Sequence, residues 1–108
     1  MTRVKSGVLV SAALRYANTK LIDCVLERRG DADAGAIFVH IDALDGRHKI
    51  LARSLNFEGE YAWHIITNTE WVDAGAAETR LTAEMEMDQD AFIVSVCDAE
   101  ARNPFDAL

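Results

Sequence analysis

The segment ERRGDADAGAIF, residues 27–38, gathers residue types that commonly build a binding loop. Glycines let backbone amides point inward as a nest for an anion, and arginines beside them add positive charge. The charged residues and glycines of this segment are therefore candidates for binding a small anionic ligand. They are Arg28, Arg29, Gly30, Asp31, Asp33 and Gly35.

Two other interpretations of this loop stay open. The spacing of Asp31, Asp33 and Gly35 is similar to the start of a calcium loop, but the twelfth position holds Asp42 instead of the closing glutamate. No metal site is predicted on that pattern. The loop can also be a plain connection between strands, in which Gly30 and Gly35 take positive φ and the aspartates bond local amides.

A second group of candidates is basic. Arg47, Lys49 and Arg53 fall on one face of a predicted hairpin, with Phe38 beside them. Cations next to an aromatic ring can hold a phosphate backbone and stack a base. Three cations and one ring are few, and the protein as a whole is acidic, so binding of nucleic acid is unlikely on these grounds and RNA binding is the weaker alternative.

The histidines suggest little catalysis. His40, His48 and His64 do not have the spacing of a metal site. His40 lies near Asp42 on the charged face of the hairpin, where such a pair can act as a general base, but no nucleophile motif accompanies it. His48 is expected at the hairpin tip in contact with solvent. We assign no catalytic residue, metal or cofactor, and the sequence favours a protein that is not an enzyme.

The hairpin is the element that would position the basic residues. Asp45-Gly46 is typical of a two-residue type I′ turn between two alternating runs. That turn pairs Leu44 with Arg47, Asp42 with Lys49 and His40 with Leu51. It predicts a buried face of Ile37, Val39, Ile41, Ile50 and Ala52, and a charged face of Phe38, His40, Asp42, Arg47, Lys49 and Arg53.

The rest of the pattern completes an α+β domain. It predicts a helix from Ser6, which would cap it, to Asn18, strands at 21–28, 61–67 and 91–97, and an acidic helix capped by Asp73 with an apolar stripe of Ala77, Leu81 and Met85. Short connections favour a meander. We therefore expect a single-layer antiparallel sheet of about five strands with two helices packed on one face, over residues 1–98, followed by a C-terminal tail of residues 99–108 without regular structure.

Composition limits the class of protein. The 108 residues carry a net charge of −7, and half of them are hydrophobic, which is globular composition. Residues 1–54 hold nine basic and six acidic side chains, whereas residues 55–108 hold two and twelve. No apolar run approaches the ~20 residues that cross a bilayer, so a cytoplasmic protein without a membrane partner is expected. Cys24 and Cys97 lie in apolar runs and are expected to be buried free thiols, although a disulfide is possible if their strands are adjacent.

Four segments resemble the domain of unknown function 1491 family, a group of small bacterial proteins of about this length. These segments are VKSGVLVSAALRYAN, ERRGDADAGAIFVHI, EWVDA and DQDAFIVSVCD, and together they cover nearly the whole chain. The most specific is the R-R-G-D-x-D-A-G-A pattern. The resemblance implies a single-domain bacterial protein and brings with it no established activity, substrate or cofactor.

Two functional hypotheses follow. The first is a non-enzymatic protein-interaction module that binds another protein or a second copy of itself, because the unequal charges of the two halves suit charge-complementary surfaces. The alternative is a protein that binds a small ligand or anion through the loop from Arg28 to Gly35, either as a plain binding protein or as an enzyme.

Overall fold

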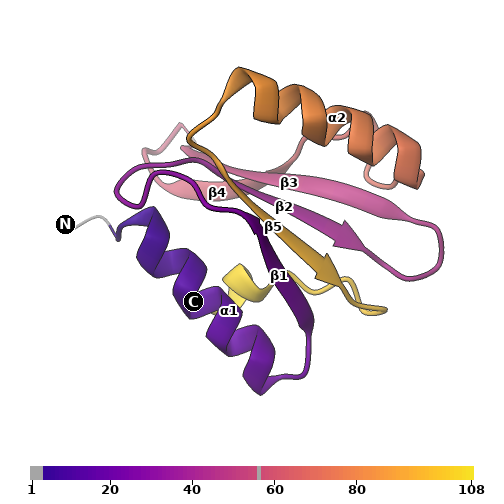
Figure 1. Ribbon diagram of the computed structural model, residues 1–108, viewed down its shortest axis with the longest axis horizontal. Helices are drawn as coiled ribbons and strands as arrows, with labels where there is room; N and C mark the ends of the chain where they lie inside the picture. Colours follow the sequence, from indigo (N-terminus) through magenta and orange to yellow (C-terminus); the bar gives the residue numbers. More distant parts are fainter. Residues whose placement is uncertain (1–3, 56) are drawn as a thin grey trace.

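The computed structural model describes residues 4–55 and 57–108. Along the chain it forms α1 (Ser6–Thr19), β1 (Asp23–Arg28), β2 (Ile37–Asp42), β3 (His48–Leu55), β4 (Tyr61–Ile65), α2 (Ala74–Met87), β5 (Phe92–Cys97) and the short 3-10 helix η1 (Pro104–Ala107) (Figure 1). The expected α+β class with five strands and two long helices is confirmed. Neither helix in the described ranges is long and apolar enough to cross a membrane.

The order of strands in the sheet differs from a meander. It is β1-β5-β2-β3-β4, and β5 runs parallel to β2 while the other neighbours are antiparallel. The expectation of a purely antiparallel sheet is therefore wrong at one pair. The chain crosses from β4 through α2 and returns β5 to the middle of the sheet, between β1 and β2.

The apolar content of two strands explains this placement. Ile37, Phe38 and Val39 in β2 are all buried, and so are Phe92, Ile93 and Val94 in β5. Strands with continuous apolar runs are typical of positions that are covered on both faces. Such strands are stable only in the centre of a sheet with packing on each side.

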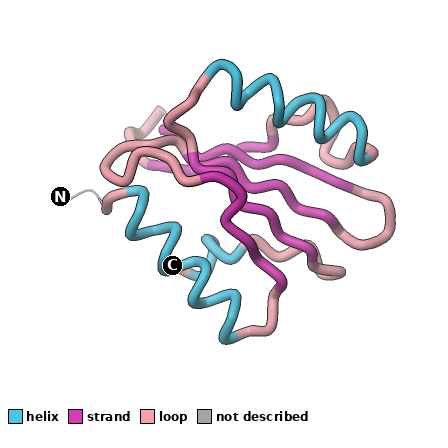
Figure 2. Tube along the Cα trace, in the orientation of Figure 1, coloured by secondary structure: helices cyan, strands magenta, loops and turns pink. Residues whose placement is uncertain are grey.

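The two helices accordingly cover opposite faces, as Figure 2 shows, so the prediction that both pack on one face is wrong. On the α1 side, Val10, Ala13 and Ala17 pack against inward-facing residues such as Val39 and Val94. On the α2 side, Ala77 packs with Phe38, Ile50 and Ile93, and Leu81 and Met85 are partly buried against that cluster. The apolar stripe predicted for the second helix is confirmed, as is its cap, because Asp73 accepts a hydrogen bond from the amide of Ala76 at 2.8 Å.

The hairpin is present, but its register is one residue away from the expected one. Asp42 pairs with His48, Ile41 with Lys49 and His40 with Ile50. The amide of Ala43 donates to the carbonyl of Arg47, which leaves a turn of three residues in which Leu44 and Gly46 have positive φ. A shift of one residue turns every side chain of a strand to the other face. Ile50 and Ala52 therefore face α2, while Lys49 and Arg53 lie on the same side of β3 as Leu51, the side of α1.

The C-terminal residues also differ from the expectation of an irregular tail. Asn103 accepts a hydrogen bond from the amide of Phe105 at 3.1 Å and so begins η1. Phe105 is buried and its ring centroid lies 4.9 Å from that of Trp63. This segment closes the core on the α1 side.

Both cysteines are free thiols, as expected, but they are half-buried instead of fully buried. Cys24 pairs with Val96 and Cys97 with Asp23, so the two thiols lie on adjacent strands. Cys24 packs on the α1 side, and Cys97 alternates with Val96 onto the α2 side, so the sheet separates them. Burial, with the charge of Asp23, raises the pKa of the Cys24 thiol to about 11.

The loop after β1 is held tightly against the start of β5. The amide of Asp31 donates to the carbonyl of Asp90 at 2.8 Å, and that carbonyl also lies against Gly30 and Gly35. Neither glycine has the positive φ expected from the sequence; the left-handed glycines are Gly46 and Gly59. Gly30 and Gly35 are needed because there is no space for a Cβ atom.

Replacing Gly30 by alanine tests this close packing. The new Cβ would meet the carbonyl oxygen of Asp90 and lie 2.7 Å from the carbonyl carbon of Ala91, and backbone atoms cannot move aside cheaply. We expect a loss of about 1–3 kcal/mol in the free energy of unfolding, measured by chemical denaturation. The control is Gly75→Ala in α2, where a Cβ has ordinary contacts and stability should rise by up to about 1 kcal/mol. Equal stability of the Gly30 variant and the wild type would contradict the packing argument.

Candidate functional site

A cleft of about 380 Å³ lies between α2 and the strands β1, β5 and β2. α2 packs over β2 and β3 and leaves β1 uncovered on this side, where Val25 is 49 % exposed. One wall is a stripe of α2, and the other comes from the sheet. We call this feature the His40 cleft; its lining residues are Glu27, Arg28, His40, Ala74, Glu78, Leu81, Met85, Ile93 and Ser95.

Two features of β1 shape the rim of the His40 cleft. Leu26 pairs with Val94 and Arg28 with Ile93, so Glu27 is the extra residue of a β-bulge. Bulges commonly redirect a side chain near functional sites. Arg28 donates to the carbonyls of Met85 at 3.4 Å and Asp88 at 3.1 Å, which places a cation at the C-terminal end of α2 and ties the helix to β1.

A pair of histidines supports the polar wall of the cleft. Nε2 of His40 and Nδ1 of His48 are hydrogen-bonded at 3.0 Å. His48 is only 8 % exposed, and its backbone exchanges two hydrogen bonds of 2.8 Å with Val72, which fix its position. On its other side, Nε2 of His48 lies 3.8 Å from Oδ1 of Asp42.

This row of groups favours one arrangement of protons. The carboxylate of Asp42 stabilises a proton on the nearer nitrogen of His48, which is Nε2. In neutral His48, Nδ1 then carries a lone pair and accepts the hydrogen bond from Nε2–H of His40. Neutral His40 is left with a lone pair on Nδ1, so it can accept a hydrogen bond from a ligand in the cleft.

The surroundings of His40 keep it neutral at neutral pH. Burial of the ring lowers the pKa of His40 below its usual 6.5, and the neighbouring His48 lowers it further. Asp42, Glu27 and Glu78 act in the opposite direction but do not outweigh these effects.

The loop predicted as the site does not converge on one point. The amides of Asp31, Asp33 and Gly35 donate to Asp90, to the side chain of Asp31 and to the carbonyl of Asp31, respectively. Asp33 pairs at 3.3 Å with Lys5, and Arg29 is exposed. Only Arg28 reaches the His40 cleft; Asp33 and Gly35 line a separate hollow of about 260 Å³.

The three basic candidates are likewise divided. Arg47 and Lys49 each lie 4.5 Å from the ring centroid of Trp71. Arg47 pairs with Asp45 at 2.8 Å, and Lys49 with Glu70 at 3.6 Å. The guanidinium carbon of Arg53 lies 3.9 Å from the ring centroid of Tyr61. Lys49 and Arg53 still share one side of β3, but Phe38, which the sequence placed beside them, lies on the α2 side of the sheet because the hairpin register differs by one residue.

Sequence reasoning missed how the cleft is assembled. His40 was considered with Asp42, but its partner is His48, which is buried and not exposed at the turn as expected. Ser95 lies beside His40 because β5 is parallel to β2, and Glu78 reaches the cleft because α2 covers the same face. The fully apolar runs in β2 and β5 were the available signal for this arrangement.

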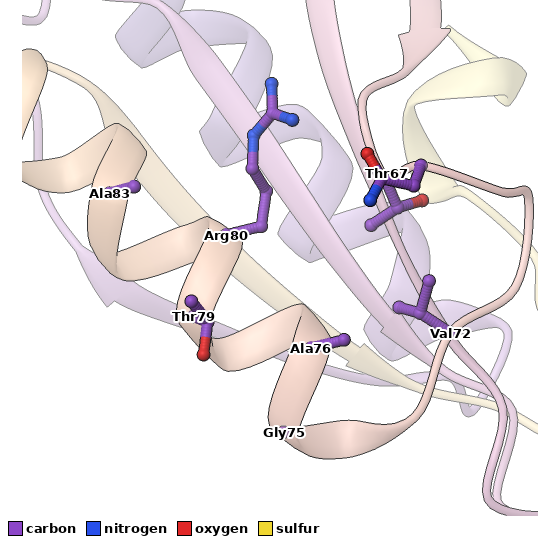
Figure 3. Close-up of a pocket in the computed structure, with 8 residues that line it drawn as sticks. Thr67, Val72, Gly75, Ala76, Thr79, Arg80 and Ala83 are labelled. Atoms are coloured by element: carbon purple, nitrogen blue, oxygen red, sulfur yellow. The ribbon is translucent and has the colours of Figure 1, made fainter.

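Two other hollows offer less chemistry. One of about 410 Å³ separates α2 from the segment after β4, where Ala76 points toward Val72 and the wall also includes Thr67 (Figure 3). Its one charged group, Arg80, is paired with Glu84 at 2.9 Å. The other, of about 470 Å³, lies between α1 and η1; its cations Lys49 and Arg102 are paired with Glu70 and Asp98.

Comparison with known proteins bears on the family. A family model described as "Protein of unknown function (DUF1491)" matches residues 4–106. The chain belongs to the DUF1491 family. The resemblance seen in the sequence is thereby confirmed, and the family description gives no activity. No curated protein matches the sequence.

Solved structures that are similar to this chain have the same fold. A crystal structure of a DUF1491 family protein from Caulobacter crescentus CB15 is 21 % identical, with a TM-score of 0.84 and coverage of 94 % of each chain. An NMR structure of a DUF1491 family protein from the same organism is 21 % identical, with a TM-score of 0.83 and coverage of 96 % of this chain and 94 % of that one. The solution structure of protein Atu0922 from A. tumefaciens is 23 % identical, with a TM-score of 0.77 and coverage of 95 % and 92 %.

The stability of this DUF1491 protein should depend on pH through His40. Its pKa is lowered in the folded state, so the unfolded chain takes up a proton first as pH falls below about 6.5, and stability is lost there. In His40→Gln, the loss of unfolding free energy between pH 7.5 and 5.5, measured by denaturation, should be smaller than in the wild type.

The matched control is His64→Gln, because His64 is an exposed residue of β4 away from the cleft. This variant should follow the wild type across the same pH range. An equal loss of stability in the His40 variant and the wild type would show that His40 is not held neutral.

Proposed function

We propose that this protein binds a small molecule in the His40 cleft. The observation that carries the proposal is a concave site with an apolar wall and one half-buried histidine, His40, whose Nε2 is hydrogen-bonded to His48. Small-molecule sites are typically clefts of about 300–1,000 Å³ lined by apolar side chains with a few placed polar groups. The His40 cleft has this size and this composition.

The cleft is also held in one shape. Arg28 fixes the C-terminal end of α2 to β1, and the two backbone hydrogen bonds between His48 and Val72 fix the residue behind His40. A binding site that is already formed loses little entropy when a ligand binds. Rigid support behind the polar wall therefore favours binding over a merely structural role for the histidine pair.

The ligand site predicted from the sequence is a loop that adjoins the His40 cleft. The candidate loop from Arg28 to Gly35 begins at the rim of the cleft, and Arg28 belongs to both. The glycines and amides of the loop are engaged with Asp90, so the loop supports β5 while the cleft offers the open surface.

An interaction module with charge-complementary surfaces stays a prediction from the sequence. It has less support than ligand binding, because several of the cations needed for such a surface already form ion pairs within the chain. Arg47, Lys49 and Arg102 have carboxylate partners at 2.8, 3.6 and 2.9 Å. These ion pairs reduce the charge that is offered to a partner.

A fragment screen by NMR tests ligand binding in the cleft. A mixed set of cationic, neutral and anionic fragments should include compounds that shift the amide signals of His40, Leu81 and Ser95. Ser95→Leu should abolish these shifts, because its longer side chain fills the cleft. The matched control is Thr79→Leu, which fills the hollow on the other side of α2 and should leave binding unchanged.

A second filling variant keeps the test valid if Ser95→Leu perturbs the sheet. Ala74→Phe is suitable because Ala74 is exposed at the start of α2 and also lines the cleft. Binding that survives both variants, or the lack of any fragment that shifts these signals, would contradict the proposal.

A further inference from the structure

Acidic side chains outnumber basic ones around the His40 cleft. Glu27 and Glu78 line the cleft with exposed carboxylates, and Asp42 lies behind His48. The one cation in the lining, Arg28, already donates to the carbonyls of Met85 and Asp88. Two carboxylates and one guanidinium leave the cleft lining with a net negative charge.

The polar groups that a ligand would meet are mainly acceptors. The arrangement of protons in the histidine pair leaves the outer nitrogen of His40 with a lone pair. A carboxylate accepts hydrogen bonds and cannot donate them, and the Ser95 hydroxyl beside His40 can adopt either role. A ligand that satisfies these groups has to bring donors, and a positive charge matches the carboxylates.

The remaining walls are apolar. Leu81 and Met85 from α2 face Ile93 from β5, and all three belong to the cluster on this side of the sheet. Methionine adapts readily to ligands of different shape. The ligand therefore has an apolar body next to its charged group.

We propose that the His40 cleft binds a small protonated amine with an apolar body, the ammonium group lying among His40, Glu27 and Glu78 and the carbon chain against Leu81, Met85 and Ile93. This inference rests on the proposed ligand-binding function and gives it a chemical class. An anionic ligand would face two carboxylates and a single cation, Arg28, which already donates two hydrogen bonds within the protein. A divalent ion is less suitable, because no group of three His, Cys, Asp or Glu side chains suited to a metal is found within residues 4–55 and 57–108.

Three probes of similar size separate the ligand classes. Butylamine, butanol and butyrate, each titrated at pH 7.5, share a short carbon chain and differ in charge. Butylamine should give saturable shifts at His40, Ser95 and Leu81, butanol should bind at least about tenfold more weakly, and butyrate should cause no shift there. If butanol or butyrate binds as tightly as butylamine, the amine class is wrong while the cleft remains a ligand site. If none of the three and no other fragment shifts these signals, both proposals are wrong.

A charge-neutral variant tests the role of the carboxylate. Glu78 is exposed on α2, so Glu78→Gln should fold normally and weaken butylamine about tenfold, since it replaces a charged hydrogen bond by a neutral one. Glu86→Gln on the same helix lies outside the cleft lining and removes the same charge from the protein. The control should leave the affinity for butylamine unchanged. If both variants weaken butylamine binding equally, the local role of Glu78 is wrong, and the change in affinity comes from the net charge of the protein.

Discussion

The parallel pairing of β2 with β5 is the constraint on which the rest of this structure depends. Both strands are apolar on their two faces, so the fold has to provide cover on each side. α1 and η1 supply it on one face and α2 on the other (Figure 1). On its other side β5 pairs with β1, and the loop that follows β1 brings Gly30 and Gly35 against the carbonyl of Asp90 without space for a side chain. The glycine-rich loop is thus a consequence of how the sheet is closed.

The same constraint creates the candidate site. One helix of fourteen residues cannot cover a face of five strands, and α2 lies over β2 and β3. The strip over β1 that α2 leaves uncovered becomes, with the neighbouring side of β5, the His40 cleft, which has apolar side chains from the core on one side and charged side chains from the edge on the other. His40 stands at this boundary because it occupies the central strand β2, and its parallel neighbour on β5 is Ser95. The histidine pair is polar and mostly enclosed, and each ring bonds the other, so its cost in desolvation is partly offset.

Much of the architecture was readable from local patterns. Asp73 marks the start of α2, and the stripe of Ala77, Leu81 and Met85 faces the sheet. The long-range features were not readable in this way. The hairpin register was wrong by one residue because Leu44 adopts a positive φ that its residue type does not predict, and this extends the turn to three residues. That difference moves His48 from the exposed turn to the buried partner of His40, so the site could not be assembled without the register.

The opening loop shows why residue types alone are a weak guide to a site. Arginines, aspartates and glycines can surround an anion, but here the glycines allow close packing and the amides bond within the chain. The surface that remains open is set by what α2 leaves uncovered, which is a property of the whole fold. A crystal structure with butylamine tests this account most directly. The account predicts the nitrogen of the amine within hydrogen-bond distance of Nδ1 of His40 and of a cleft carboxylate, with its carbon chain against Leu81 and Met85. Butylamine bound in the hollow between α1 and η1, or in the loop from Arg28 to Gly35, with the His40 cleft unoccupied by it, would contradict the account.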